Sequence, residues 1–311
     1  MTQRGRNLVW ALKWPFLGIV DGFGRPTGWA LLNGPVVTPR QQQQFAELRW
    51  AGYRLAGMSS YMGFPRVEDG DAMEYEGACE VWCHCFRHPD RFLATDIPRA
   101  LISVSDFTDY RRVNPATIPQ GSAAEHVDFV YVGGTADWQR RRKNWALAAQ
   151  CIPQLCEDLG LRCLVIGAPT ADFLPSRSVS FSAPLPRRSF LSMVAASRFL
   201  FVPNEIDASP RVIAEALCLD VPVVANRNIL GGWKYISHFT GTFFTGTDDV
   251  VAAVSAFLFT PQAPRAWFRA NYGPDIASER LLCLLRSVDP ALSGCQRVRL
   301  PAWCREPTAV R

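Results

Sequence analysis

The chain has 311 residues, of which 48% are hydrophobic and 20% charged, and its formal net charge is +5. This composition is close to that of an average soluble globular protein and excludes a disordered or collagen-like chain. The positive charge is modest and spread along the sequence, so it suits an anionic small ligand but does not argue for nucleic acid. The length allows two domains of ordinary size.

The N-terminal residues resemble a signal peptide only in part. Two arginines precede an apolar stretch, but Lys13, Trp14 and Pro15 interrupt it, and we predict a first buried strand instead. The longest nearly apolar stretch, residues 250–259, has about half of the roughly 20 residues that a membrane-spanning helix needs.

The cysteines predict a reducing compartment. Several of the 10 lie inside apolar segments, among them Cys163, Cys218 and Cys283, whereas a disulfide scaffold places them in the loops of a much shorter chain. We therefore expect mostly buried free thiols and a cytoplasmic location.

The first half of the chain predicts a smaller α/β unit. Segments rich in β-branched and aromatic residues predict strands at 7–24, 53–61, 79–86 and 99–107, and residues 41–52 predict a helix. A stretch with Pro and Gly, residues 114–125, is expected to link this unit to the next.

The second half alternates strands and helices. Strands are expected at 128–134, 162–167, 199–203 and 221–226, and helices at 144–159, 189–198, 209–220 and 248–259. Pro153 is expected to end or kink the first of these helices. The alternation predicts a parallel sheet covered on both faces, whose ligands bind beyond the carboxyl ends of its strands.

The strongest candidate site follows the strand at 199–203. Asn204, Glu205 and Asp207 lie in a polar loop, and a helix begins near Ser209. Helix N-termini bind phosphate through free N–H groups, and Arg211 adds a positive charge there. Glu215 lies one turn further along an otherwise apolar face. From spacing alone, an ordinary surface ion pair between Glu215 and Arg211 explains this acid equally well.

The pair Asp207 and Glu215, followed by Ala-Leu and then Pro-Val-Val-Ala, resembles the nucleotide-sugar segment of retaining GT-B glycosyltransferases, especially the short forms of glycosyltransferase family 4. The resemblance implies that Glu215 holds the ribose hydroxyls, that Asp207 contacts the donor sugar, and that N–H groups near Arg211 and Val212 meet the diphosphate. Asp207 replaces the family's usual Glu. Pro210 replaces a Gly and removes one N–H.

A second segment, residues 130–148, carries the same resemblance. Gly133 and Gly134 end a strand, and Lys143 precedes a helix. The family typically has Arg and Lys at these places, and the two cations grip the diphosphate. Lys143 matches the Lys, but Gly134 stands where the Arg is expected. Arg211 or one of the arginines at 140–142 is a candidate to replace it, although a solvated basic turn explains 140–142 as well.

The resemblance covers about residues 128–285 and implies the fold class. We expect an α/β, GT-B-like protein with two Rossmann-like parallel-sheet domains facing a cleft. The acceptor domain would span 1–125 and the donor domain 126–270, with residues 231–236 as a donor loop. A C-terminal helix and tail, 271–311, would pack back across both domains.

Two features of the first half have alternative explanations. Gly22, Gly24 and Gly28 miss the dinucleotide-binding spacing by one residue, so they form either a plain turn or the family's cleft-facing loop. His84 lies near the end of a strand, where the family often has a catalytic-site His, but a packed or surface imidazole is equally compatible with that place.

Metal binding is not expected. Cys79, Cys83, Cys85 and His88 are conceivable zinc ligands, but no second ligand pair follows. The Asp-Gly-Asp at residues 69–71 matches the metal-binding pair of GT-A glycosyltransferases, but it lies in a polar stretch that predicts a turn.

These observations predict a glycosyltransferase that takes its sugar from a nucleotide-diphospho sugar, retains the anomeric configuration and needs no metal or other cofactor. The acceptor, whether a glycan, a lipid-linked molecule or a protein, is open, and peripheral membrane contact is compatible with a lipid-linked one. Two other functions fit the same residues: an epimerase, hydrolase or phosphorylase on this fold, and a non-catalytic nucleotide-sugar-binding protein. A Rossmann oxidoreductase fits less well, because its fingerprint is missing.

Overall fold

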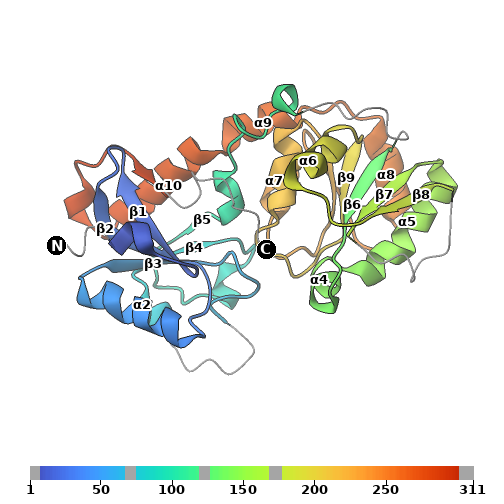
Figure 1. The fold of residues 1–311 in the computed structure, drawn as a ribbon. Coiled ribbons are helices and arrows are strands. Elements are labelled where there is room, and N and C mark those ends of the chain that lie inside the picture. The colour runs from blue at the N-terminus through green and yellow to red at the C-terminus, as the bar shows by residue number, and fades with distance from the viewer. Residues whose placement is uncertain (1–7, 67–74, 119–126, 168–176, 301–311) are drawn as a thin grey trace. The chain divides into compact units, whose positions relative to one another are not determined.

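The computed structural model describes residues 8–66, 75–118, 127–167 and 177–300. The chain forms two compact units (Figure 1). Unit 1 comprises residues 1–107 and 274–311, and unit 2 comprises 108–273. The chain therefore crosses between the units twice, after Phe107 and after Gly273. The first crossing lies earlier than the predicted boundary at 125, because Val113 is already buried in the core of unit 2.

Unit 1 is built on a six-stranded sheet of mixed direction. The strands are β12 (Val298–Arg299), β1 (Phe16–Asp21), β2 (Pro26–Leu32), β3 (Arg54–Met58), β4 (Val81–His84) and β5 (Arg99–Leu101), in that order. The β12–β1 and β1–β2 pairs are antiparallel, and β2 to β5 run parallel.

The glycine-rich stretch after the first strand is a β-hairpin turn. The Asp21 carboxylate accepts hydrogen bonds from the N–H groups of Phe23 and Arg25 at 2.9 and 2.8 Å, and Gly24 has φ +81°. The chain then returns as β2, a strand that the sequence analysis missed. The predicted strand at 7–24 is also shorter than expected, because residues 8–11 are helical and β1 begins only at Phe16.

Helices cover both faces of the unit 1 sheet. One face packs against α10 (Pro274–Arg286), and the other against α2 (Pro39–Trp50) and α3 (Tyr75–Ala78). Alternation along β4 shows the two faces, because Cys83 belongs to the first core and Trp82 to the second. Helix α2 begins with a capping box between Thr38 and Gln41, as its sequence suits.

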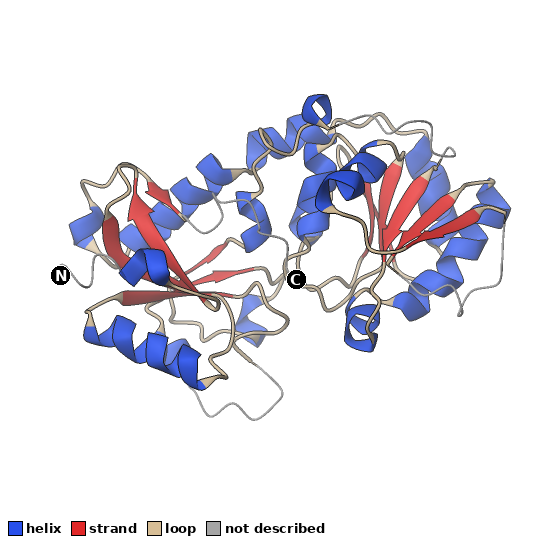
Figure 2. Ribbon diagram, viewed as in Figure 1, coloured by secondary structure: helices blue, strands red, loops and turns tan. Residues whose placement is uncertain are grey.

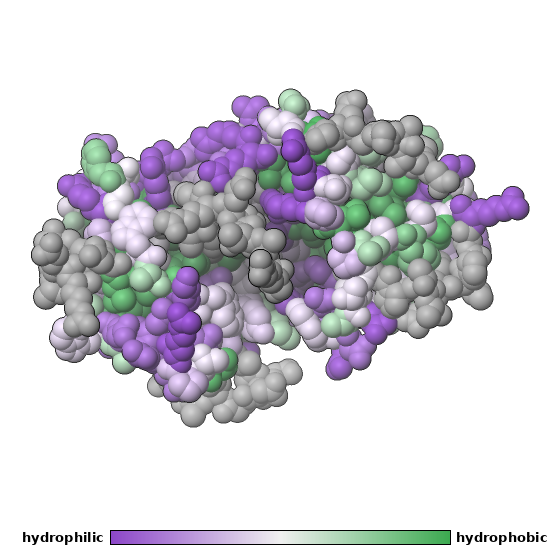
Figure 3. Space-filling view, in the orientation of Figure 1, coloured by the Kyte–Doolittle hydropathy of each residue, from purple (hydrophilic) through white to green (hydrophobic). Residues whose placement is uncertain are grey.

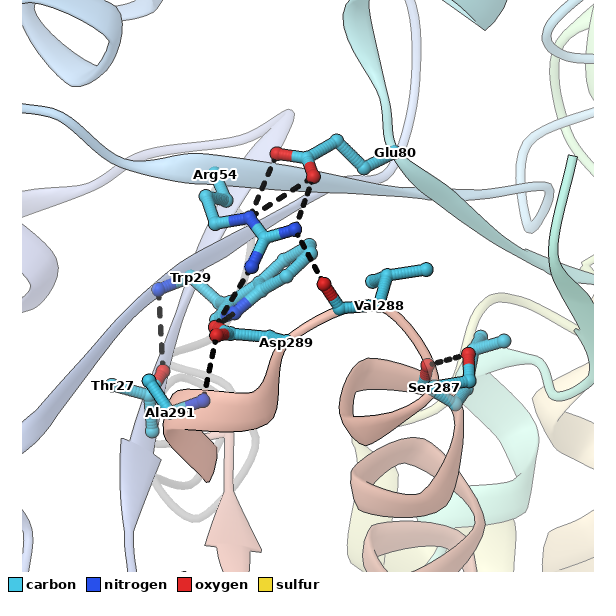
Figure 4. A network of polar contacts seen from close by, with 9 residues as sticks. Thr27, Trp29, Arg54, Glu80, Ser287, Val288, Asp289 and Ala291 are labelled. Carbon is cyan, nitrogen blue, oxygen red and sulfur yellow. Dashed lines mark hydrogen bonds and ion pairs between the residues drawn. The ribbon is translucent and has the colours of Figure 1, made fainter. Parts of the chain in front are cut away.

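A polar network ties the end of α10 to the sheet (Figure 4). Arg54 pairs with Asp289 at 3.0 Å, pairs with Glu80, and stacks over the Trp29 ring at 4.4 Å. The Trp29 indole N–H donates to Asp289 at 2.7 Å. Because Arg54 opens β3 and Glu80 precedes β4, the network lies at the amino ends of parallel strands, away from the edge where such sheets bind ligands.

Unit 2 contains a fully parallel six-stranded sheet, drawn red in Figure 2. The order is β11 (Gly241–Phe244), β10 (Val223–Asn226), β9 (Phe199–Val202), β6 (Phe129–Val132), β7 (Cys163–Ile166) and β8 (Val179–Ser182). Its helices are α4 (Asp137–Arg142), α5 (Trp145–Leu159), α6 (Arg187–Ala195), α7 (Arg211–Cys218), α8 (Val250–Leu258) and α9 (Pro264–Asn271).

Two hydrophobic cores lie on opposite faces of this sheet. Helices α6, α7 and α9 cover one face, and α5 and α8 cover the other. Strand β6 contributes Val130 to the first core and Phe129 and Tyr131 to the second, as strand alternation requires. The predicted parallel sheet covered on both faces is therefore confirmed for unit 2.

Several predicted elements of unit 2 differ in extent. Strands β8 and β11 were not predicted. Pro153 lies inside α5, which continues to Leu159 rather than ending early. The C-terminal segment resembling one final helix is two helices, because the chain breaks at Gly273, where φ is +105°. Helix α9 belongs to unit 2 and α10 to unit 1.

The cysteines are mostly buried, as predicted. Of the nine that the structure describes, seven are buried free thiols, but Cys283 is exposed, because it lies on the outer side of α10. Burial raises the pKa of Cys156 to about 11, so this thiol is protonated at neutral pH.

In the face drawn in Figure 3, hydrophobic residues show in places among hydrophilic ones. Within the described residues, no helix is both long and apolar enough to cross a membrane.

Candidate functional site

The loops at the carboxyl ends of β6, β7 and β8 meet in unit 2. Gly167, with φ +80°, ends β7, and a side chain added there would lie 3.5 Å from the Gly133 carbonyl and 4.0 Å from Pro184. These three residues follow three neighbouring strands. The edge where parallel sheets bind ligands is thus closely packed at this point, and it has a glycine where the backbones approach.

The turn after β6 has no room for a side chain at residue 134. A Cβ on Gly134 would lie 2.2 Å from the Cβ of Gln139. Gln139 instead fixes the turn, because its carboxamide oxygen accepts from the N–H groups of Thr135 and Ala136 at 3.0 and 3.3 Å. Gly134, predicted to bind the donor, therefore lies in a tight turn whose backbone Gln139 fixes and where no side chain fits.

Lys143 and Asp207, far apart in the chain, form an ion pair. The Lys143 Nζ lies 3.1 Å from Oδ2 of Asp207, and Asn204 donates to the same oxygen at 3.0 Å. Asp207 and Asn204 are buried, whereas about a quarter of the Lys143 side chain is exposed. The structure thus brings three predicted residues, from the segments that follow β6 and β9, into one cluster in which Lys143 is the most exposed.

Two asparagines extend this cluster. Asn144, held in the left-handed region at φ 51°, donates to the Pro203 carbonyl at 3.0 Å and to Glu205 at 3.4 Å. Asn226, fully buried at the end of β10, donates to the same two partners at 3.3 Å each. The carboxylate of the exposed Glu205 is therefore oriented by two amides, one at the start of α5 and one at the end of β10.

Glu215 pairs with an unpredicted arginine. Its Oε1 lies 2.6 Å from Nη1 of Arg187, the first residue of α6, and Glu215 itself is only 7% exposed. The alternative explanation, a surface ion pair with Arg211, is wrong, because the Glu215 carboxylate is buried against α6. Arg211 is exposed at the first position of α7.

The start of α7 is fixed by a close contact between two loops. Gly232, with φ +84°, approaches Pro210 so closely that a Cβ there would lie 2.6 Å from the proline ring. The N–H groups of Leu230 and Gly231 donate to the carbonyls of Glu205 and Asp207 at 2.7 and 3.0 Å. The predicted donor loop at 231–236 thus packs onto the segment that leads into α7, and it supports the helix start.

Ser209 and Val212, the other predicted residues of this segment, flank that helix start. Both are partly exposed, and the first N–H groups of a helix lack intrahelical partners. The start of α7 therefore offers an N-terminal dipole and N–H donors of the kind that bind phosphate.

A pocket of about 510 Å³ opens next to Lys143. It is lined by Asp137, Arg140, Arg141, Asn144, Trp145 and Ala146, which come from α4 and the start of α5. Basic side chains and a helix N-terminus both favour a negatively charged ligand at this place. Two of the arginines of residues 140–142 line this pocket: Arg141 is exposed, and Arg140 pairs with Asp137.

His84 ends β4 of unit 1 and is buried, at 7% exposed, with its ring stacked on Phe86. The described residues contain no group of three or more metal-binding side chains. Cys79 and Cys83 belong to cores on opposite faces of the sheet, so the zinc alternative fails on geometry. Asp69 and Asp71 lie outside the described residues.

Comparison with known proteins gives structural but not sequence matches. No protein-family model matches the chain, and no curated protein is significantly similar in sequence. A glycosyltransferase from Rickettsia africae is similar in structure, with a TM-score of 0.59 and 12% identity, over 84% of this chain and 75% of that one. Sucrose-phosphate synthase from Thermosynechococcus elongatus gives 0.56 and 12%, over 80% and 71%.

A third similar structure is HepE of Anabaena in complex with UDP-glucose, with a TM-score of 0.54 and 12% identity, over 81% of this chain and 77% of that one. At such low identity these likenesses establish the fold. Two α/β units built on parallel or largely parallel sheets, matched to glycosyltransferases, define a GT-B-like protein.

Sequence analysis missed Arg187, Asn144, Asn226 and Gln139, and it placed Glu205 in the polar loop without giving it a role. Asn226 was recognisable in principle, because it ends a predicted central strand at the ligand-binding edge. Nothing in the local sequence links Arg187 to Glu215, since 27 residues and an entire strand separate them in the chain.

Proposed function

We propose that the protein is a glycosyltransferase that takes its sugar from a nucleotide-diphospho sugar. The observation that carries the proposal is the joining of Lys143 to Asp207 at 3.1 Å, at strand ends adjoining the start of α7. Similar structures include glycosyltransferases, one of them in complex with UDP-glucose. A cation beside a helix N-terminus suits a diphosphate, and buried carboxylates suit sugar hydroxyls.

Each residue of the cluster has a role in this proposal. Lys143 and the N–H groups near Arg211 and Val212 hold the diphosphate. Glu215 accepts the ribose hydroxyls, and Asp207 with Asn204 contacts the donor sugar. Gly133 lets the backbone come close to the phosphates, while Ser209 and Pro210 set the direction in which α7 starts.

The reaction proposed is transfer with retention of configuration and without a metal. As the bond from the sugar to the nucleotide diphosphate breaks, negative charge grows on the leaving phosphate. Lys143 and the α7 dipole stabilise that charge electrostatically, with no proton transfer to the phosphate required. Asp207 keeps the Lys143 ammonium in place before the donor arrives.

Unit 1 is proposed to bind the acceptor, with His84 as its catalytic candidate. The acceptor's identity is left to experiment. A lipid-linked acceptor would bring the protein into peripheral contact with a membrane surface. Flotation of the protein with lipid vesicles tests whether this contact occurs.

Product analysis tests the function. The protein would be incubated with UDP-, GDP- and ADP-sugars in EDTA, with and without a mixture of glycan, lipid-linked and peptide acceptors. Acceptor-dependent release of one nucleoside diphosphate, together with a glycosylated product, supports transfer. Release without any acceptor identifies a hydrolase, and a changed sugar on an intact nucleotide identifies an epimerase.

A second candidate function is non-catalytic binding of a nucleotide sugar. Gly134 favours it, because the turn has no room for the cation that relatives carry there. In this case one nucleotide binds tightly, but no donor is consumed with any acceptor.

A further inference from the structure

We propose that Arg187 is a positioning residue of the donor site, which holds Glu215 in the orientation needed to bind the nucleotide's ribose. This inference rests on the proposed function. It gives Arg187 a role in binding the nucleoside part of the donor. Arg187 lies outside the two segments, 130–148 and the one that begins at Asp207, on which the family resemblance rests.

The Glu215 carboxylate is buried and needs a charged partner. Only 9% of its side chain is exposed, and its chain neighbours Ala214 and Ala216 on α7 are fully buried in the first unit 2 core. A buried carboxylate is costly unless it is paired and hydrogen-bonded. At 2.6 Å, Arg187 supplies that partner with a short, charge-assisted contact.

Arg187 lies beside the loops at the carboxyl ends of the unit 2 strands. It opens α6, directly after the loop that leaves β8, and that loop lies beside the carboxyl ends of β6 and β7 through Pro184, Gly167 and Gly133. Helix α6 packs beside α7, as Figure 1 shows. Arg187 therefore lies at the ligand-binding edge, and 46% of its side chain is exposed there.

The contact between Arg187 and Glu215 leaves acceptor positions on the carboxylate for a ligand. Arg187 is bonded to Oε1 of Glu215 through one nitrogen, Nη1. A carboxylate has about four acceptor positions, so Oε2 and the second lone pair of Oε1 can accept ribose hydroxyls while the arginine stays bound. Arg187 thereby fixes the plane of the carboxylate before the nucleotide arrives, which lowers the entropy lost on binding.

The test compares ribose with deoxyribose on matched variants. Wild type, Arg187→Met and the neighbouring exposed control Arg188→Met are titrated calorimetrically with UDP, GDP and ADP. The nucleotide that binds is then replaced by its 2′-deoxy analogue. We expect Arg187→Met to weaken the ribonucleotide about tenfold or more, the scale of one charged hydrogen bond, and the deoxy analogue by less than about threefold. Arg188→Met should change neither.

Other outcomes separate the inference from the function. Equal weakening of both nucleotides, unchanged binding, or tighter binding by Arg187→Met overturns the role of Arg187 and leaves the donor site standing. Failure of all three nucleotides to bind wild type overturns the donor site itself. Arg187→Lys, which keeps the charge and one donor, is expected to recover part of the ribose-dependent affinity, and melting temperatures verify that each variant is folded.

Discussion

At the scale of single residues, the most informative side chain is Lys143. It is the one predicted phosphate-binding cation that the structure joins to another predicted site residue, Asp207. Arg142 precedes it directly and has the same charge, but stacks on Trp138 instead. Lys143 and Arg142 therefore differ in their contacts and not in their charge, because only Lys143 of the two pairs with Asp207.

Replacing Lys143 by Met should lower turnover about 100- to 1000-fold, because one preformed contact to the developing charge is removed. Arg142→Met, the matched control, should retain at least about half of the wild-type rate. Steady-state release of the nucleoside diphosphate measures both. Similar losses in the two variants would contradict a specific role for Lys143.

Asp289 provides a residue-scale prediction about pH. Burial raises its pKa, but hydrogen bonds from Trp29 and Ala291 and the charge of Arg54 outweigh burial and hold the pKa below its usual 3.8. A lowered pKa in the folded state adds stability above the unfolded value, and this stability is lost as pH falls through the folded value.

Asp289→Asn should therefore reduce the free energy of unfolding by about 1–2 kcal/mol at pH 7. The difference from wild type should shrink as the pH falls below about 3.8. Urea unfolding at a series of pH values measures it. Asp90→Asn, at an exposed ion pair, is the control and should cost less than about 0.5 kcal/mol. A difference that grows in acid would refute the assignment.

At the scale of elements, α10 supplies one complete layer of unit 1 although it is encoded after all of unit 2. Leu281 and Leu285 are fully buried against the sheet, whereas Cys283 between them is exposed. Helical periodicity explains this contrast, because residue 283 lies on the opposite side of the helix. The apolar context around Cys283 in the sequence suggested burial, and was misleading for that reason.

Leu281→Ala should destabilise unit 1 by about 2–5 kcal/mol, from lost burial and the cavity left behind. Cys283→Ala should change stability by less than about 0.5 kcal/mol. Chemical unfolding monitored by tryptophan fluorescence compares them. Equal, small effects would mean that α10 is not part of the unit 1 core.

Sequence patterns predicted unit 2 better than unit 1 for a physical reason. In unit 2 the central strands β6, β7 and β9 are continuous apolar runs, and helices follow β6 and β9 in the chain, so local periodicity matches the fold there. In unit 1, β2 begins in a stretch of Gly, Arg and Pro that resembles a loop. Strand β8, with the sequence Val-Ser-Phe-Ser, is too short and polar to stand out.

Candidate site residues could be proposed from spacing along the chain, whereas the non-local contacts among them could not. Asp207, Glu215 and Lys143 were found by their order along the chain. The ion pair of Glu215 with Arg187 joins helices α7 and α6, and the hydrogen bonds of Asn144 and Asn226 to Glu205 join the start of α5 and the end of β10 to the loop after β9. Such contacts depend on sheet order, in which β6 lies between β9 and β7, and local sequence does not encode that order.

At the scale of the whole molecule, the proposed donor site belongs to unit 2 alone. Hydrogen exchange should therefore show nucleotide-induced protection at 133–146, 183–188 and 203–213, which flank the ends of β6, β8 and β9. The Arg54 network at the amino ends of the unit 1 strands should show no change. Protection confined to unit 1 would contradict the assignment of the donor site.

The most direct test is calorimetric titration of the full chain with UDP, GDP and ADP in EDTA, on wild type and Glu215→Gln. We predict that one nucleotide binds wild type without metal, and that Glu215→Gln weakens it at least about tenfold, because the charged partner of the ribose hydroxyls is lost. Binding of none of the three, or equal binding to both proteins, would contradict the proposed donor site.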